Sequence, residues 1–215
     1  MKQASSILNR LLHPPLWALI GVPAVSFASL AAVFACHYED HALAYLIYSM
    51  SAYYLALGVL RAYLVIGYRR RTPARECRCY RRTAWLLFLL NIPMGGMIVL
   101  MVRTNSGFSY PGYVIYLSAL YTFYTMITSV LNLIKFRRLG SPILSAAKVL
   151  NFVAALMSIL GLQTAMIARF SAHGEGYRRM MNAITGGFVY GIVVLIAVYM
   201  LLHSRTLRKK VEPLE

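Results

Sequence analysis

Neutral polar side chains recur at steps of three and four residues along the apolar segment 111–134, so they share one face of a helix. These residues are Ser118, Tyr121, Thr125, Thr128 and Asn132. Polar groups exposed to lipid lack partners, so we expect this face to turn into a helix bundle, where Asn91 and Asn151 of neighbouring segments could meet it. The face could form a pocket or path for a small neutral or zwitterionic solute. The alternative is structural hydrogen bonding between helices, with each bond worth about 0.6 kcal/mol.

Arg61 is the charged residue that lies well inside an apolar segment. It precedes Arg69 by eight residues, about 12 Å along a helix axis. We expect its side chain to snorkel toward that basic end, because snorkelling lowers the cost of burying the charge. In the alternative, Arg61 faces inward on the same stripe as Tyr54 and binds an anionic group such as a carboxylate. No acidic residue at that depth is available, so its partner would then be a ligand or a backbone carbonyl.

Two short clusters contain residues that can bind metals. In the segment 36–41, His37 and His41 are four residues apart, a spacing that could hold zinc if the segment is helical. No further ligands support this cluster, and we predict neither a metal site nor a cofactor. Cys77 and Cys79 lie in an arginine-rich connection, where a reducing compartment would keep both thiols free. Redox sensing or metal binding by these thiols is the alternative to an incidental presence.

The central portions of the apolar segments lack Asp, Glu and His. Intramembrane metalloproteases need His and carboxylate ligands, and serine enzymes need a base beside the nucleophile. Proton-coupled carriers usually place ionisable groups at membrane depth. The chain also has no phosphate-cradling glycine loop of a nucleotide-hydrolysing motor. We therefore predict that the protein is not an enzyme.

These side chains must be positioned by helices that lie within a bilayer. The 215 residues are 60% hydrophobic and 13% charged, which is about half the charge of a soluble domain. A helical span needs about 20 apolar residues. The sequence predicts an all-α, polytopic transmembrane bundle, formed as one domain over residues 1–215. Its six expected spans are 16–36, 43–67, 84–102, 111–134, 149–168 and 184–202. The longest connection would be 68–83, which is too short for a soluble domain.

Basic residues are distributed unevenly between the two sides of this bundle. Of the 22 Lys and Arg residues, 17 lie before the first span, in the second and fourth connections and in the tail, whereas four lie in the other connections. The positive-inside rule therefore predicts that both termini are cytoplasmic, which agrees with an even number of spans. We expect the net charge of +16 to attract anionic lipid head groups, and we expect no nucleic-acid partner.

The second half of the chain contains several distinctive short segments. They are 105–113, 121–124, 141–146, 163–166 and 178–183. In these segments the chain resembles a family of uncharacterised bacterial integral membrane proteins. The resemblance implies a six-span bundle and a bacterial source, and it implies no substrate because the family has no assigned activity. The length of the chain and the alanine spacing of the first expected span also resemble the substrate-binding components of energy-coupling-factor vitamin transporters.

The sequence thus predicts a multi-pass protein of the bacterial cell membrane that binds or transports a small solute, with or without membrane partner subunits. The alternative is a non-catalytic scaffold or accessory subunit, including a substrate-binding component of a larger transporter. The candidate solute-binding residues are Tyr54, Arg61, Asn91, Ser118, Tyr121, Thr125, Asn132 and Asn151.

Overall fold

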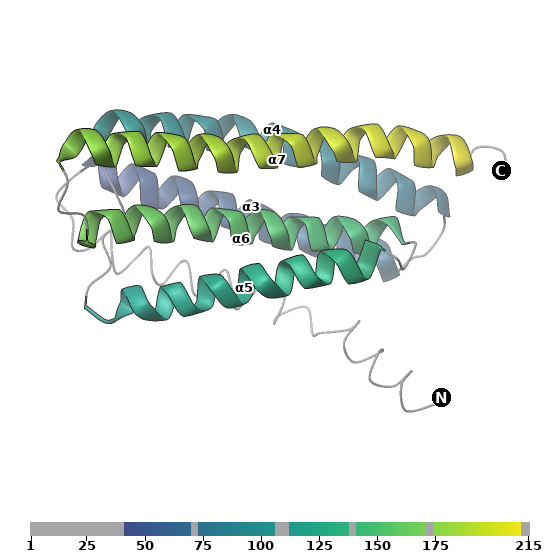
Figure 1. The fold of residues 1–215 in the computed structure, drawn as a ribbon. Helices are drawn as coiled ribbons and strands as arrows, with labels where there is room; N and C mark the ends of the chain where they lie inside the picture. The colour runs from purple at the N-terminus through teal and green to yellow at the C-terminus, as the bar shows by residue number, and fades with distance from the viewer. Residues whose placement is uncertain (1–40, 70–72, 106–111, 138–140, 171–173, 212–215) are drawn as a thin grey trace, which may run out of the picture.

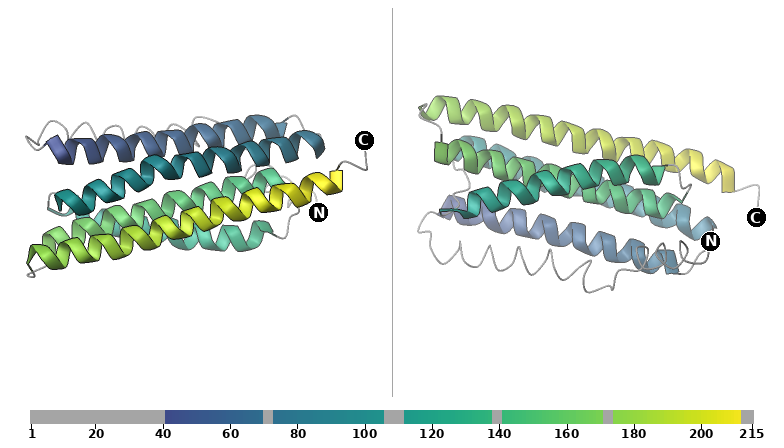
Figure 2. Two further views of the ribbon diagram at one scale, coloured as in Figure 1. Left: turned by 90° about the horizontal axis from the view of Figure 1, so that it is seen from above. Right: turned by 60° about the horizontal axis from the view of Figure 1, so that its bottom comes forward.

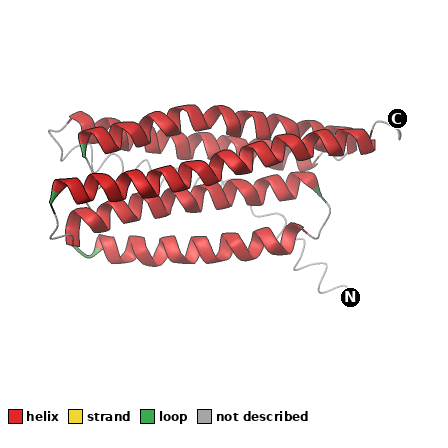
Figure 3. Cartoon of the chain, turned by 45° about the horizontal axis from the view of Figure 1, so that its top comes forward, coloured by secondary structure: helices red, strands yellow, loops and turns green. Residues whose placement is uncertain are grey.

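The computed structural model describes most of the chain after residue 40 as a bundle of long helices (Figure 1). The described residues are 41–69, 73–105, 112–137, 141–170 and 174–211. Their helices are α3 (His41–Arg69), α4 (Pro73–Thr104), α5 (Val114–Arg137), α6 (Pro142–Phe170) and α7 (Glu175–Val211). Within this part of the chain the regular structure is helical throughout (Figure 3).

Each of the five helices is long and apolar enough to cross a membrane. The prediction of an all-helical bundle is confirmed for the described residues, and five of the expected spans coincide with helices. The first expected span, 16–36, lies outside the described residues. Six spans and cytoplasmic termini therefore stay predictions.

The helices extend beyond the expected spans, and two expected connections are wrong. Because α4 begins at Pro73, most of the segment 68–83 is helical. Proline suits the first turn of a helix, where its missing N–H costs nothing. The added turns of α4 are amphipathic, so a search for apolar blocks does not detect them. At the opposite end, α7 begins at Glu175 and replaces most of the expected connection 169–183.

The most extensive contact between helices joins α4 and α7, while α3 packs against α4 and α6. Helix α5 lies at the edge of the described bundle and contacts α6 alone among the described helices, as Figures 1 and 2 show. The shared core consists of large apolar side chains. Among the fully buried ones are Leu57, Leu64, Leu87, Met94, Leu150, Met157 and Met200.

Glycine permits the close approach of α4 and α7. A Cβ atom at Gly186 would lie 2.6 Å from Cγ2 of Ile98, which is shorter than a real contact. Gly67 plays the same part between α3 and α4, because its Cβ atom would lie 2.9 Å from Sγ of Cys79. Small residues at helix contacts are typical of bundles in lipid, where packing replaces the hydrophobic effect.

Large apolar side chains also cover much of the outer surface. Leu120, Phe188 and Leu195 are each more than two thirds exposed, on α5 and α7. A soluble monomer rarely leaves so much apolar area in water. Helices with apolar cores and apolar outer faces are typical of a protein surrounded by lipid.

Candidate solute-binding site

Arg61 points from α3 toward α6. Its Nη2 donates a hydrogen bond of 3.2 Å to the carbonyl oxygen of Leu150. Arg61 lies eight residues before the end of α3 at Arg69, and Leu150 lies eight residues after the start of α6 at Pro142. Because these two ends share one side of the bundle, both residues lie about 12 Å from it. The guanidinium thus remains at the depth of its own helix position.

The expected snorkelling of Arg61 is therefore wrong. The inward alternative describes the structure, with a backbone carbonyl as the protein partner. The physical reason is that α3 packs directly against α6 at this depth. A carbonyl oxygen is then available without extending the side chain toward the head groups.

Tyr54 lies two helical turns before Arg61 on the same stripe of α3. Its hydroxyl donates to the carbonyl oxygen of Ala154 at 3.2 Å and shares a hydrogen bond of 2.9 Å with Oγ of Ser158. Ser158 in turn donates to the carbonyl of Ala154 at 3.1 Å. The side of α3 that faces α6 thus presents a phenol and a guanidinium to polar atoms of the neighbouring helix.

A second cation stands close to Arg61. Lys148 of α6 interacts electrostatically with the guanidinium and repels it, because both groups are positive. The hydroxyl groups of Tyr54 and Tyr121 are the other electrostatic neighbours of Arg61. Tyr121 comes from α5, so side chains of three helices surround this position.

Among the described residues, no ion pair joins Arg61 to a carboxylate. Glu76 lies near the start of α4 and accepts a hydrogen bond of 3.2 Å from Oγ of Ser141. Glu175 begins α7 at the opposite end of the bundle and pairs with Arg178 at 3.9 Å. Within the same part of the chain, the buried Nε of Arg61 has no hydrogen-bond partner. The arrangement therefore combines positive charge with an unused donor, and both features favour an anion.

The polar face of α5 is turned only partly into the bundle. Ser118, Thr125 and Asn132 are partly buried, as expected, whereas Tyr121 is 56% exposed. Thr125 donates to the backbone carbonyl of Thr122 in its own helix at 3.0 Å. Thr128 does the same with the carbonyl of Tyr124 at 2.8 Å. These threonines satisfy their hydroxyl groups locally.

The two candidate asparagines are placed differently. Asn91 is buried on α4, where its Nδ2 donates to the carbonyl of Leu87 at 3.0 Å. Because α4 does not contact α5, the expectation that Asn91 meets the polar face of α5 is wrong. Asn151 is partly buried on α6 and lies three residues after Lys148, on the same side of that helix. The structure thus groups Asn151 with the cations and separates Asn91 from them.

Sequence reasoning missed Lys148 and Ser158. Lys148 was assigned to a basic connection, but α6 begins at Pro142 and encloses it. Ser141 followed by proline is a typical start of a helix, and the Ser145 N–H donates to the Ser141 carbonyl at 3.1 Å. This local signal could have placed Lys148 inside the helix. Ser158 lies within the expected span 149–168, and its partner Tyr54 is 104 residues away along the chain.

The cysteine and histidine clusters need one correction. Cys77 and Cys79 do not lie in a loop: both are buried on α4, and the Cys77 thiol contacts the carbonyl of Ser204 at 3.9 Å. His37 lies outside the described residues. Among the residues that are described, three or more metal-capable side chains nowhere gather into a group.

Compared with known proteins, the sequence matches no family model, no curated protein and no solved structure. The resemblance to bacterial six-span proteins stays a prediction.

Proposed function

We propose that this chain binds a small solute with a carboxylate or another anionic group between α3, α5 and α6. It does so in the bacterial cell membrane, as a carrier or as the solute-binding subunit of a transporter. The observation that carries the proposal is Arg61, whose guanidinium lies between helices with one hydrogen bond to a backbone carbonyl and a buried Nε that has no hydrogen-bond partner among the described residues. Lys148 is a second cation near this guanidinium.

The energetic argument is that the Arg61 guanidinium is costly to bury without a ligand. Placing one Arg or Lys at the centre of a span costs about 2.5–3.5 kcal/mol on insertion scales. The hydrogen bond from Arg61 to Leu150 offsets little of this cost, since such bonds average about 0.6 kcal/mol in membrane proteins. The proximity of Lys148 adds repulsion. An anion between the two side chains would remove the repulsion and offset the cost of burial.

The side chains also suit the recognition of a carboxylate. Arg61 uses Nη2 for the Leu150 carbonyl, and its buried Nε remains for a ligand. A planar guanidinium can bind the two oxygens of a carboxylate together, whereas Lys148 supplies a point charge. Tyr54 is fixed by Ala154 and Ser158 and forms one wall of the site.

The proposal is tested by thermal unfolding of the purified protein with sodium salts of mono-, di- and tricarboxylic acids and of phosphate. Sodium chloride at equal ionic strength is the reference. We expect at least one anion to raise the unfolding temperature of the wild type, and Arg61→Lys and Lys148→Gln to reduce that increase. Arg103→Lys, at an exposed arginine on the opposite end of α4, is the matched control. The proposal is wrong if no anion stabilises the wild type more than chloride does.

The second candidate function is a non-catalytic scaffold or accessory subunit. The bonds of Thr125 and Thr128 to their own helix favour it, because those hydroxyl groups are then unavailable to a solute. The link from Tyr54 to Ser158 would in this case serve only to join α3 and α6. A scaffold predicts that Arg61→Lys leaves unfolding unchanged with every anion.

Both termini in the cytoplasm and six spans complete the proposal. The support is that the basic end of α3, the start of α4 and the end of α7 lie on one side of the bundle (Figure 1). Labelling of a single cysteine at position 72 by an impermeant reagent in intact cells tests this orientation. Labelling from outside the cell would contradict it.

A further inference from the structure

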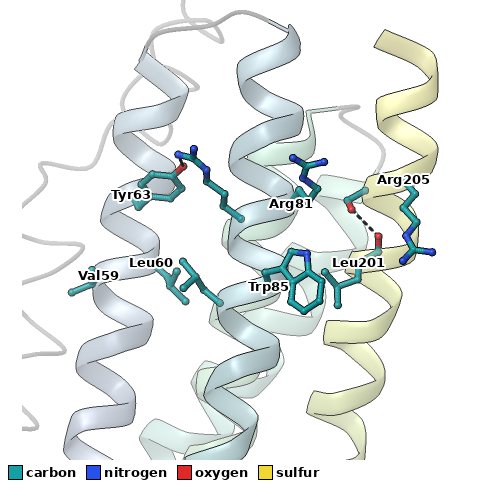
Figure 4. A pocket seen from close by; sticks show the side chains of 10 residues that line it. Val59, Leu60, Tyr63, Arg81, Trp85, Leu201 and Arg205 are labelled. Atoms are coloured by element: carbon teal, nitrogen blue, oxygen red, sulfur yellow. Dashed lines mark hydrogen bonds between the residues drawn. The ribbon is translucent and has the colours of Figure 1, made fainter. Parts of the chain in front are cut away.

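A groove of about 1120 Å³ lies on the surface of the bundle, between α3, α4 and α7. Figure 4 shows Leu60 and Tyr63 on α3, Trp85 on α4, and Leu201 and Arg205 on α7 around the same hollow. The groove shares no residue with the proposed solute site. It therefore requires an explanation of its own.

The groove is polar at its outer end and apolar one turn deeper on each helix. On α3, Tyr63 lies three residues closer to the basic end than Leu60. On α4 and α7, Arg82 and Arg205 lie four residues closer to that end than Leu86 and Leu201 do. Three polar–apolar pairs therefore line the groove: Tyr63 with Leu60, Arg82 with Leu86, and Arg205 with Leu201. A ligand that fits this pattern has a polar head and an apolar chain.

The arginines reach the groove because α4 is amphipathic in its first turns. Arg78, Arg81, Arg82 and Trp85 follow one another at helical spacing and are exposed, so they form one face. Buried residues on the opposite side of α4 hold that face outward. They are Cys77, Tyr80, Ala84 and Leu87.

Among the described residues, no ion pair joins these rim arginines to a carboxylate. Arg82 donates a single hydrogen bond of 3.4 Å to the hydroxyl of Tyr63. A smaller hollow of about 360 Å³ adjoins the groove through Tyr63 and Arg82, and two further arginines, Arg75 and Arg78, line it. The rim therefore attracts negative charge.

The rim also lies at the expected depth of lipid head groups. Arg81 and Arg82 come two to three residues before the apolar block that begins at residue 84, and Arg205 comes three residues after the block that ends at 202. Trp85 and Tyr63 supply the interfacial aromatic side chains that are common at this level. The argument holds for either leaflet, because it depends only on the distance from the end of the apolar block.

We propose that this groove binds one anionic phospholipid, with its head group among Arg81, Arg82 and Arg205 and an acyl chain against Leu60, Leu86 and Leu201. A free phosphate ester would use the arginines and leave the apolar wall uncovered. A neutral lipid would use the wall and leave the positive charge without a counterion. An anionic lipid satisfies both.

Trp85 lines the groove and can report its occupancy by fluorescence. The chain has two tryptophans, so Trp17→Phe leaves Trp85 as the sole reporter. This variant is reconstituted in two samples of phosphatidylcholine vesicles. One sample contains a small fraction of brominated phosphatidylglycerol, and the other contains the same fraction of brominated phosphatidylcholine. We expect the groove to bind brominated phosphatidylglycerol at least about fivefold more tightly than brominated phosphatidylcholine. One basic residue near the surface contributes about 1 kcal/mol to the binding of an anionic lipid, and this energy corresponds to about fivefold.

Two matched variants in the same background isolate the rim. The triple change Arg81→Gln, Arg82→Gln and Arg205→Gln should reduce the preference to near unity. The control is Arg103→Gln, Arg169→Gln and Arg179→Gln, which removes the same charge from exposed arginines at the opposite end of the bundle. We expect the control to keep the wild-type preference. Equal quenching by both lipids, or a preference that survives the change of the rim, would contradict the proposal.

A third arm separates a lipid from a soluble phosphate ester. Glycerol 1-phosphate in excess over the brominated phosphatidylglycerol should leave the quenching of Trp85 unchanged, because it lacks the chain that contacts Leu60 and Leu86. If the soluble ester releases the lipid, the groove is a site for free phosphate esters and the assignment to a lipid is wrong. Failure of this experiment leaves the site at Arg61 unaffected, since the two share no residue.

Discussion

The two cationic regions of this bundle place similar side chains in opposite surroundings. Arg61 and Lys148 lie between helices, and the guanidinium has one protein hydrogen bond, to Leu150. Arg81 and Arg82 are exposed at the rim of a groove and are available to head groups or water. A guanidinium at the rim costs little without a ligand, whereas one between helices has lost its hydration. We therefore expect an anion to stabilise the surroundings of Arg61 more than it stabilises the rim.

The difference also predicts the size of the possible ligand. Side chains of α3, α5 and α6 surround Arg61 with a few polar atoms, which suit a small solute. The groove has a volume of about 1120 Å³ and an apolar wall, so it suits an amphiphile. Substitutions that affect one region and spare the other test this division.

The largest effect is expected for Arg61→Met. Removing one member of a buried charge contact typically costs 2–5 kcal/mol in binding, so we expect affinity for the carboxylate to fall on the order of a hundredfold. The unfolding temperature without ligand should rise or stay constant, because the variant no longer buries a charge. Ligand titrations and thermal unfolding measure the two quantities. A marked loss of stability without ligand would show that Arg61 serves the fold through Leu150.

A smaller effect is expected for Gly186→Ala, which disturbs the packing of α4 against α7 at the end of the bundle away from the groove. A methyl group there would lie 2.6 Å from Cγ2 of Ile98, and overpacking of this kind costs about 1–3 kcal/mol. At Gly187 an added Cβ has no atom within 4 Å, so Gly187→Ala is the control. Thermal unfolding should separate the two variants. Equal unfolding temperatures would mean that α4 and α7 pack less closely than described.

The smallest effect is a difference in salt dependence. The Debye length falls from about 10 Å at 0.1 M salt to about 3 Å at 1 M, and exposed charges are screened more than buried ones. We therefore expect added potassium chloride to reduce the preference of the groove for phosphatidylglycerol, while affinity at Arg61 changes less. Quenching of Trp85 and titration of the solute provide the comparison. A stronger effect of salt on the affinity at Arg61 than on the lipid preference of the groove would contradict the assignment of Arg61 to the less exposed region.

The sequence was sufficient to predict the five described helices, because blocks of about 20 apolar residues can be satisfied in lipid only as helices. It was insufficient for their ends. The first turns of α4 are amphipathic and contain exposed arginines, so they resemble a basic loop when only apolar residues are counted. The start of α6 at Ser141 and Pro142 was marked by local residues, and using that mark would have placed Lys148 inside the helix.

The orientation of Arg61 was not predictable, since the same residue at the same depth can snorkel or turn inward. The outcome depends on whether a neighbouring helix offers an acceptor, and Leu150 is 89 residues away along the chain. The groove depends even more on tertiary structure. It requires Arg205 of α7 to lie beside the arginine face of α4, and no periodicity within one helix indicates that arrangement.

The central claim is that Arg61 holds an anion between the helices, and calorimetric titration tests it most directly. The carboxylate that stabilises the wild type most is titrated into wild type, Arg61→Lys and Arg82→Lys. The account predicts one site per chain, the same affinity for wild type and Arg82→Lys, and affinity weaker by about tenfold or more for Arg61→Lys, because lysine lacks the planar fork. Equal affinity in wild type and folded Arg61→Lys would contradict the account.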